Sequence, residues 1–202
     1  MASGGSSGGA GVRSSGGFGG AIGGTVWLTG LSGSGKSTIA GHLASLLDRD
    51  GVPALVLDGD ELRKGLNADL GFGEADRAEN VRRVGEVALL FARHGFVVLV
   101  PVISPYAAGR AAVRARHDHL ATPYVEVHVD TPLEVCEARD PKGLYVKARA
   151  GLIERFTGIS DPYEPPPSPE VRLDTDGTEP GALAAGLLER LRRFVPALAS
   201  GD

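Results

Sequence analysis

Short runs of apolar residues recur along the chain, separated by stretches that contain glycine, proline or charged residues. The runs that predict strands cover residues 25–29, 54–57, 96–103, 125–129 and 171–173. The run from Phe96 to Ile103 is apolar at every position, without the alternation of a half-exposed strand. This pattern is typical of a strand in a parallel sheet that is covered on both faces.

The segments between these runs carry apolar residues at helical spacing. Residues 39–47 predict one helix. A second helix is predicted to begin near Asp76, where Asp76 and Glu79 can form a capping box, and to end at Gly95.

Two further helices follow the fourth predicted strand. One is predicted at Thr131-Pro132, with Pro132 at the first helical position and Glu134 completing a capping box. The other covers about residues 179–194. Because strands alternate with helices, we predict a doubly wound α/β domain with a mainly parallel sheet and its sites at the carboxyl ends of the strands.

The junction between the first predicted strand and helix carries the phosphate-binding pattern Gly-x-x-x-x-Gly-Lys-Ser. It comprises Gly30, Leu31, Ser32, Gly33, Ser34, Gly35, Lys36, Ser37 and Thr38. Glycines allow backbone N–H groups to surround phosphate oxygens, and the following helix adds its dipole. In this motif Lys36 reaches the β- and γ-phosphates and Ser37 holds Mg²⁺. A chance glycine turn is disfavoured because motif and context agree, so we predict binding of a nucleoside triphosphate.

Composition and charge narrow the class of protein. Residues 1–24 are almost entirely Gly, Ser and Ala, which predicts a flexible tail before a single domain at 25–202. No secretory signal or membrane-spanning run is present, and the only cysteine is Cys136. The net charge of −4 argues against a general nucleic-acid-binding surface. We therefore expect a cytoplasmic protein without a membrane or nucleic-acid partner.

Polar residues follow the second and third predicted strands. Asp58 and Asp60 come after the second strand, where one carboxylate can bind Mg²⁺ and one can accept the proton of an attacking hydroxyl. One of the two is also placed to cap the next helix. Ser104 follows the third strand, so these groups should converge on one crevice.

A polar helical region and a basic segment offer further ligand groups. Arg63, Arg77 and Asn80 suit an anionic, hydrogen-bonding ligand, but solvated surface arginines fit the pattern equally well. The basic segment at about 140–160 is consistent with either a lid over the phosphates or a charged loop. Phe72 and Phe156, in glycine-rich surroundings, could stack on a base or simply pack locally.

Taken together these stretches resemble the adenylyl-sulfate kinase (APS kinase) family of P-loop kinases. The resemblance covers roughly residues 25–195 and rests on several matching stretches. They are Trp27 to Thr38, Leu57 to Asp60, Gly65 to Asn67, Leu70 to Phe72, Asp76-Arg77, Glu79-Asn80, Arg82-Arg83, Ile103 to Tyr106, Asp130 to Glu137, Arg139 to Tyr145, Phe156 to Gly158 and Asp161 to Glu164.

The resemblance implies that ATP donates its γ-phosphate to the 3′-hydroxyl of adenosine 5′-phosphosulfate, with Mg²⁺ as cofactor. It implies that Gly30 to Thr38 and Arg139 bind ATP, that Lys36, Asp58, Asp60 and Ser104 are catalytic, and that Ser37 and Asp58 hold the metal. The implied acceptor site comprises Asp58, Asp60, Arg63, Phe72, Arg77, Asn80, Ile103, Ser104, Lys142, Leu144 and Phe156. The family has a serine labelled a phosphoserine intermediate at the position of Ser104, but direct in-line transfer needs none. The resemblance also implies a homodimer.

The chain departs from the family pattern in two places. Glu61 stands where the family often has Asn, and Pro101-Val102 stands where a Ser-Leu pair is more usual. Glu61 adds negative charge near an anionic acceptor, so a kinase with another acceptor is the first alternative. An inactive nucleotide-binding partner of a sulfate-assimilation enzyme is the second, although Lys36, Ser37, Asp58 and Asp60 are intact. We expect no fused ATP sulfurylase domain in this chain.

Overall fold

The computed structural model describes residues 22–199, so the predicted tail lies almost wholly outside the described residues. The chain forms a five-stranded parallel sheet in the order β2-β3-β1-β4-β5, which confirms the predicted fold class. The strands are β1 (Gly24–Thr29), β2 (Ala54–Val56), β3 (Val97–Pro101), β4 (Tyr124–Val129) and β5 (Val171–Leu173). The helices are α1 (Lys36–Arg49), α2 (Gly59–Leu62), α3 (Glu74–Ala92), α4 (Ala107–His119), α5 (Leu133–Arg139), α6 (Leu144–Arg149) and α7 (Pro180–Leu191), followed by the short 3₁₀ helix η1 (Pro196–Leu198).

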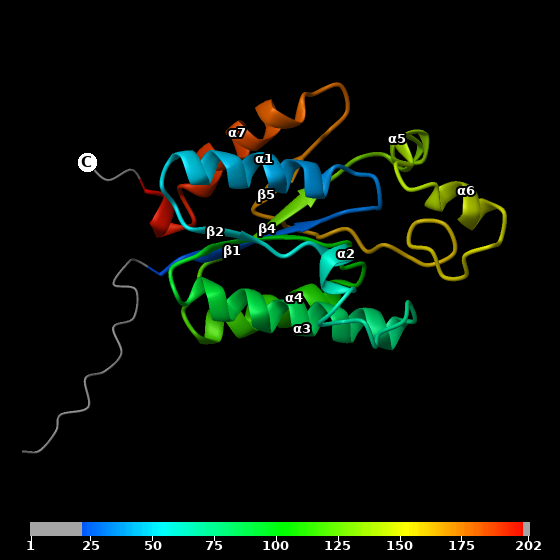
Figure 1. Cartoon of the computed structure of the whole chain (residues 1–202), viewed down its shortest axis with the longest axis horizontal. Helices are drawn as coiled ribbons and strands as arrows, with labels where there is room; N and C mark the ends of the chain where they lie inside the picture. Colours follow the sequence, from blue (N-terminus) through cyan, green and yellow to red (C-terminus); the bar gives the residue numbers. More distant parts are fainter. Residues whose placement is uncertain (1–21, 200–202) are drawn as a thin grey trace, which may run out of the picture.

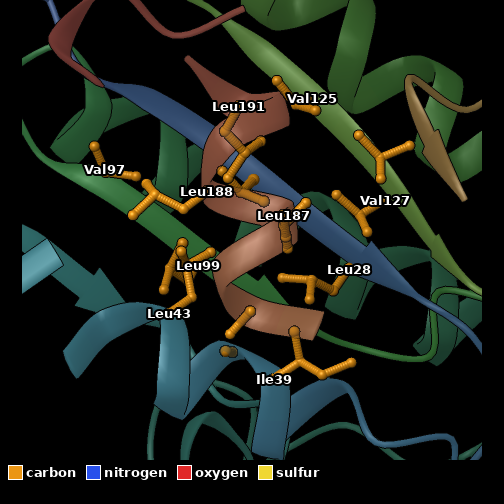
Figure 2. Close-up of a cluster of buried hydrophobic side chains, with 14 of the residues drawn as sticks. Leu28, Ile39, Leu43, Val97, Leu99, Val125, Val127, Leu187, Leu188 and Leu191 are labelled. Atoms are coloured by element: carbon orange, nitrogen blue, oxygen red, sulfur yellow. The ribbon is translucent and has the colours of Figure 1, made fainter. Parts of the chain in front are cut away.

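Helices cover both faces of the sheet, with α1 and α7 on one face and α3 and α4 on the other (Figure 1). On the first face, Leu43 of α1 and Leu187 of α7 pack against Leu28 and Leu99 of the central strands (Figure 2). On the second face, Trp27 lies in a separate apolar cluster with side chains of α3 and α4. Helices α5 and α6 extend from one end of the sheet, beside the carboxyl ends of β1 and β4 (Figure 1).

The third strand is buried on both faces, as its unbroken apolar run predicts, but it is shorter than expected. Residues Val97 to Val100 are fully buried. The ladder ends at Pro101 instead of continuing to Ile103. Ser104 adopts a positive φ of 41°, so the chain turns away from the sheet at the edge where the site lies.

The capping box predicted for the second helix is wrong, whereas its predicted C-terminal cap is confirmed. Helix α3 begins at Glu74, and no side chain caps it. Glu79 instead bonds the neighbouring guanidinium of Arg82 at 2.7 Å. At the other end, Gly95 has a φ of 92° and its N–H donates to Ala92 O at 3.1 Å, which is the geometry of a glycine cap.

The capping box predicted at Thr131 is also wrong. Pro132 is the N-cap of α5 rather than its first helical residue, and no side chain caps this helix. The Thr131 hydroxyl donates instead to the carbonyl of Ser34 in the phosphate-binding loop, at 3.0 Å. A long-range contact has therefore replaced the local cap.

Helix α4 was not predicted, because its sequence is rich in Ala and Arg and offers few large apolar residues at helical spacing. Its buried positions are Arg110, Val113 and His117, of which only Val113 is apolar. No helix among residues 22–199 is long and apolar enough to cross a membrane.

Candidate active site

The loop between β1 and α1 forms the base of the site. Gly33 and Gly35 have φ values of 72° and 100°, a conformation that glycine adopts without strain. Lys36 begins α1 and is buried, and its ammonium donates to Leu31 O at 2.6 Å and to Ser34 Oγ at 3.3 Å. Burial lowers the pKa of Lys36 to about 8. The loop therefore holds a desolvated cation among backbone N–H groups, an arrangement suited to a polyanion.

Asp58 lies beside this loop at the end of β2. Its Oδ2 accepts a hydrogen bond from the hydroxyl of Ser37 at 2.8 Å. Its Oδ1 accepts from the N–H of Asp60 at 2.9 Å and caps α2. Asp58 is therefore the capping aspartate that the sequence allowed, and the same carboxylate faces Ser37. The Asp60 carboxylate forms an ion pair with Lys142, which comes from the predicted lid 82 residues away.

A cavity of about 730 Å³ lies over these residues and brings most of the predicted site together. The predicted residues that line it are Ser32, Gly33, Gly35, Lys36, Ser37, Thr38, Asp58, Asp60, Arg63, Phe72, Arg77, Asn80, Ile103, Ser104, Lys142, Leu144 and Phe156. Gly30, Leu31, Ser34 and Arg139 are not among the lining residues. The phosphate-binding loop and the arginine- and phenylalanine-bearing segments thus face one continuous space.

Arg63 and Arg77, two of the three arginines that line the cavity, also bond main-chain carbonyls of the surrounding loops. Arg77 donates to Phe72 O at 2.8 Å and to Arg155 O at 2.6 Å, and it lies close to Asp161. Arg63 donates to Leu70 O at 3.1 Å, and its guanidinium lies 4.4 Å from the centre of the Phe72 ring. The arginines are therefore not free surface cations, although each still lines the cavity.

Asn80 and the two phenylalanines complete this side of the cavity. Asn80 Oδ1 accepts from the Asn67 side chain at 3.0 Å. The Phe72 side chain is exposed, at 60% of its surface, whereas Phe156 is only 8% exposed and packs against Tyr145. The Phe156 side chain is therefore held by its neighbours, whereas the Phe72 side chain is open to solvent at the edge of the cavity.

Ser104 reaches the cavity wall through a loop that a buried ion pair holds in place. Its hydroxyl accepts from the Trp27 indole at 3.0 Å and donates to Thr29 Oγ1 at 3.0 Å. Arg110, which pairs with Glu126 at 2.8 Å, donates to the Ser104 carbonyl at 2.7 Å. These bonds fix the positive φ of Ser104 and the position of neighbouring Ile103.

The predicted lid contains α6 and packs on the phosphate-binding loop. The carboxylate of Asp140 accepts backbone hydrogen bonds from Leu144, Tyr145 and Val146 at 2.8, 3.0 and 3.1 Å. This cap places Pro141, Lys142 and Leu144 along the cavity. This first part of the segment is therefore folded along the cavity, and its action as a lid stays a prediction.

Arg139 and Glu61 lie away from the cavity. Arg139 donates to the hydroxyl and the carbonyl of Thr175, both at 2.8 Å. Glu61 bonds Lys64 at 2.6 Å, and its side chain is 70% exposed. Since Glu61 does not line the cavity, its charge gives no support to an altered acceptor.

Several lining residues were not predicted as site residues. They are Gly59, Val81, Pro101, Val102, Pro105, Pro141, Ile153, Arg155 and Thr157. Gly59, Pro105, Pro141 and Thr157 lie within the stretches that carry the family resemblance, and Arg155 lies in the basic segment. The others are apolar, and their types alone do not distinguish them from core residues. Thr175 was also missed, although it follows β5 at the same edge of the sheet as the other sites.

Comparisons with known proteins agree on one family. Residues 22–174 match the family model described as adenylylsulphate kinase. An adenylyl-sulfate kinase of Citrobacter koseri is 56% identical over 168 residues, which make up 83% of this chain and 82% of the relative. The structure of the Mycobacterium tuberculosis APS kinase CysC in complex with AMPPNP and APS has a TM-score of 0.83 and 53% identity, and covers 85% of this chain and 98% of that one.

Some relatives are much longer than this chain. The bifunctional enzyme NodQ of Azospirillum brasilense is 54% identical over 168 residues, but the matched part is only 27% of its length. The similarity to such proteins therefore concerns one of their parts.

Proposed function

The chain belongs to the adenylyl-sulfate kinase family, and we propose that it transfers the γ-phosphate of ATP to the 3′-hydroxyl of adenosine 5′-phosphosulfate. The product is 3′-phosphoadenosine 5′-phosphosulfate. The observation that carries this proposal is the single cavity, which has a phosphate-binding loop on one side and Arg63, Arg77 and two phenylalanines on the other. ADP release that depends on this acceptor tests the proposal.

The donor half of the site is the phosphate-binding loop. The N–H groups around Gly33 and Gly35 bind phosphate oxygens, and the α1 N-terminus adds its positive dipole end. Lys36 exchanges its bonds to Leu31 and Ser34 for the β- and γ-phosphates. This exchange gives the buried ammonium the negative partner that it lacks among its present acceptors.

Mg²⁺ is the proposed cofactor, held by Ser37 and Asp58. The hydroxyl of Ser37 and the carboxylate of Asp58 lie 2.8 Å apart, and such oxygen ligands are those that Mg²⁺ prefers. When bound with ATP, the ion neutralises charge on the phosphate oxygens. Ser37 and Asp58 would hold that ion, while Lys36 and the loop N–H groups orient the phosphate chain.

The acceptor half places the 3′-hydroxyl beside the carboxylates. Phe72 and Phe156 hold the adenine, while Arg63, Arg77 and Asn80 contact the phosphosulfate or the nucleoside. Asp58 accepts the proton from the 3′-oxygen as that oxygen attacks the γ-phosphorus and the bond to ADP breaks. Asp60 stands beside it and holds Lys142 of the lid.

The lid and the Ser104 loop complete the proposed site. The closed lid excludes water, which protects ATP from hydrolysis. The carbonyl and hydroxyl of Ser104 are both hydrogen bonded within the protein, which supports a role in shaping the wall together with Ile103. Arg139 and Thr175 form the surface proposed to meet the ATP adenine. The homodimer remains a prediction from the resemblance, and the cytoplasmic location remains a prediction from composition.

A further inference from the structure

Two carbonyl groups of the phosphate-binding loop point outward and are held by hydroxyl groups from elsewhere in the chain. The Ser34 carbonyl accepts from Thr131 at 3.0 Å. The Ser32 carbonyl accepts from the phenol of Tyr145 at 2.9 Å. In a trans peptide the C=O and the following N–H point in opposite directions. Anchoring these carbonyls outside therefore aims the N–H groups of Gly33 and Gly35 into the loop, where phosphate oxygens bind.

Tyr145 also touches the acceptor half of the site. Its side chain lies in α6, 113 residues after Ser32, and is only 2% exposed. Its ring meets that of Phe156 edge-to-face, with the centroids 4.9 Å apart and an interplanar angle of 78°. Phe156 lines the cavity on the side assigned to the acceptor base. One buried side chain therefore contacts both the donor loop and the acceptor platform.

The contact between the Tyr145 and Phe156 rings lies within a small apolar cluster, which restricts the movement of the Tyr145 ring. Cys136, Tyr145 and Phe156 are buried in it, and Leu31 of the phosphate-binding loop packs against it. The cap at Asp140 fixes the start of the helix that carries Tyr145. Because packed side chains transmit displacements, a shift of the Phe156 ring moves the Tyr145 hydroxyl relative to Ser32.

We propose that Tyr145 is a positioning residue that couples the two substrate sites. Its hydroxyl sets the Ser32–Gly33 peptide for phosphate binding, and its ring supports the base-stacking face of Phe156. An acceptor base that stacks on Phe156 holds Tyr145 in place and thereby tightens binding of the donor. This inference rests on the proposed function, which makes Phe156 part of the acceptor site.

Tyr145→Phe isolates the hydroxyl because the ring contact with Phe156 is kept. Calorimetry measures the Kd of AMPPNP, a non-hydrolysable ATP analogue, with and without adenosine 5′-phosphosulfate. Without the acceptor, we expect AMPPNP to bind Tyr145→Phe about three- to tenfold more weakly than it binds the wild type, which is the effect of one lost hydrogen bond. We expect the acceptor to tighten AMPPNP binding about fivefold or more in the wild type, and less than about twofold in Tyr145→Phe.

Two matched variants distinguish a loss of coupling between the two substrate sites from a general loss of AMPPNP affinity. Thr131→Val removes the shorter of the two hydroxyl bonds that hold the Ser34 carbonyl, which Thr175 also contacts at 3.3 Å. Thr131 is outside the cluster that holds Phe156, so this variant should weaken AMPPNP binding modestly and keep the coupling. Tyr124→Phe removes a buried hydroxyl that has no hydrogen-bond partner within residues 22–199. The AMPPNP affinity of this variant, and the change in that affinity on addition of the acceptor, should both stay at wild-type values. Thermal unfolding checks that each variant is folded.

Nuclear magnetic resonance of the wild type gives a test that needs no variant. Addition of adenosine 5′-phosphosulfate alone should shift the amide signal of Gly33, which follows the carbonyl held by Tyr145, more than that of Gly35. Equal shifts, or wild-type coupling in folded Tyr145→Phe, would overturn the inference. If the wild type binds AMPPNP but not this acceptor, both the proposed function and the coupling are refuted. In that case the AMPPNP affinity of Tyr145→Phe still decides whether the Tyr145 hydroxyl positions the phosphate-binding loop.

Discussion

The hydroxyl of Ser37 donates a 2.8 Å hydrogen bond to Oδ2 of Asp58, although the two residues are 21 positions apart. β1 and β2, which precede them, are separated in the sheet by β3. The contact joins the start of α1 to the cap of α2, because the other oxygen of Asp58 accepts from the Asp60 N–H. One carboxylate is thus oriented by the fold toward the place where phosphate, metal and acceptor hydroxyl would meet.

The first prediction concerns the proton acceptor. Asp58→Asn should lower turnover by about 10²- to 10⁴-fold, the usual contribution of a positioned base. ATP affinity should change far less, because no residue of the phosphate-binding loop is replaced and Asn keeps a side-chain oxygen that can accept from Ser37. The fold should also survive, since Asn caps helices as well as Asp does. Steady-state kinetics and calorimetry measure the two quantities.

The matched control for this variant is Asp118→Asn. Asp118 is exposed and does not line the cavity. It should retain wild-type turnover and affinity. Equal losses of turnover and ATP affinity in Asp58→Asn would show that Asp58 mainly serves the metal.

The second prediction concerns the pH dependence of ATP binding. Burial lowers the pKa of Lys36 to about 8 in the free protein, and a bound triphosphate raises it again because the added charge is negative. Above about pH 8 the free lysine is largely neutral, so binding takes up a proton and affinity falls as pH rises. Calorimetry in buffers with different ionisation enthalpies counts that proton.

Lys36→Ala is the comparison for this measurement. It should bind ATP at least about tenfold more weakly, lose turnover as well, and show no lysine-dependent proton uptake. The same proton count in the variant and the wild type would assign the uptake to another group.

The third prediction concerns Ser104. Its hydroxyl is bonded to Trp27 and Thr29, so Ser104→Ala should leave the indole N–H unpaired and reduce the free energy of unfolding by about 1 to 3 kcal/mol. Turnover should fall less than about tenfold, whereas loss of a covalent nucleophile can cost on the order of 10⁶-fold. Mass spectrometry of the protein after incubation with ATP should find no phosphate on Ser104, and finding it there would favour the phosphoserine route.

The fourth prediction separates the two phenylalanines. Phe72→Ala and Phe156→Ala should each raise the KM for the acceptor about fivefold or more, because each removes one stacking face. Phe72 is 60% exposed, so its loss should change stability within about 0.5 kcal/mol. Phe156 is buried, and its loss should cost about 3 to 5 kcal/mol. Acceptor kinetics and chemical denaturation provide the comparison, and an unchanged acceptor KM in Phe72→Ala would remove it from the site.

The sequence was sufficient for the fold class and for most of the cavity wall. The unbroken apolar run after Phe96 indicated a strand buried on both faces, and the motif ending in Lys36 indicated the phosphate site. Ser37, Asp58 and Ser104 were expected to converge because the carboxyl ends of parallel strands share one edge. All three line the cavity.

Features that depend on tertiary contacts could not be predicted from local pattern. The capping box at Thr131 failed because its hydroxyl bonds Ser34, 97 residues away. The link between Tyr145 and Ser32 likewise spans 113 residues, and no spacing rule indicates such a pair. Glu61 is a different case, because its i,i+3 pair with Lys64 is local, and it was its place outside the cavity that became evident only in the structure.

The most direct test of the central proposal is an ADP-release assay with adenosine 5′-phosphosulfate as acceptor and adenosine 5′-monophosphate as the control. Both offer an adenine and a 3′-hydroxyl, but only the first carries the phosphosulfate that the arginine-lined half of the cavity is proposed to bind. We predict rapid ADP release with adenosine 5′-phosphosulfate, formation of its 3′-phosphorylated product by mass analysis, and little release with the control. The absence of ADP release that depends on adenosine 5′-phosphosulfate, from protein that binds ATP, would contradict the account.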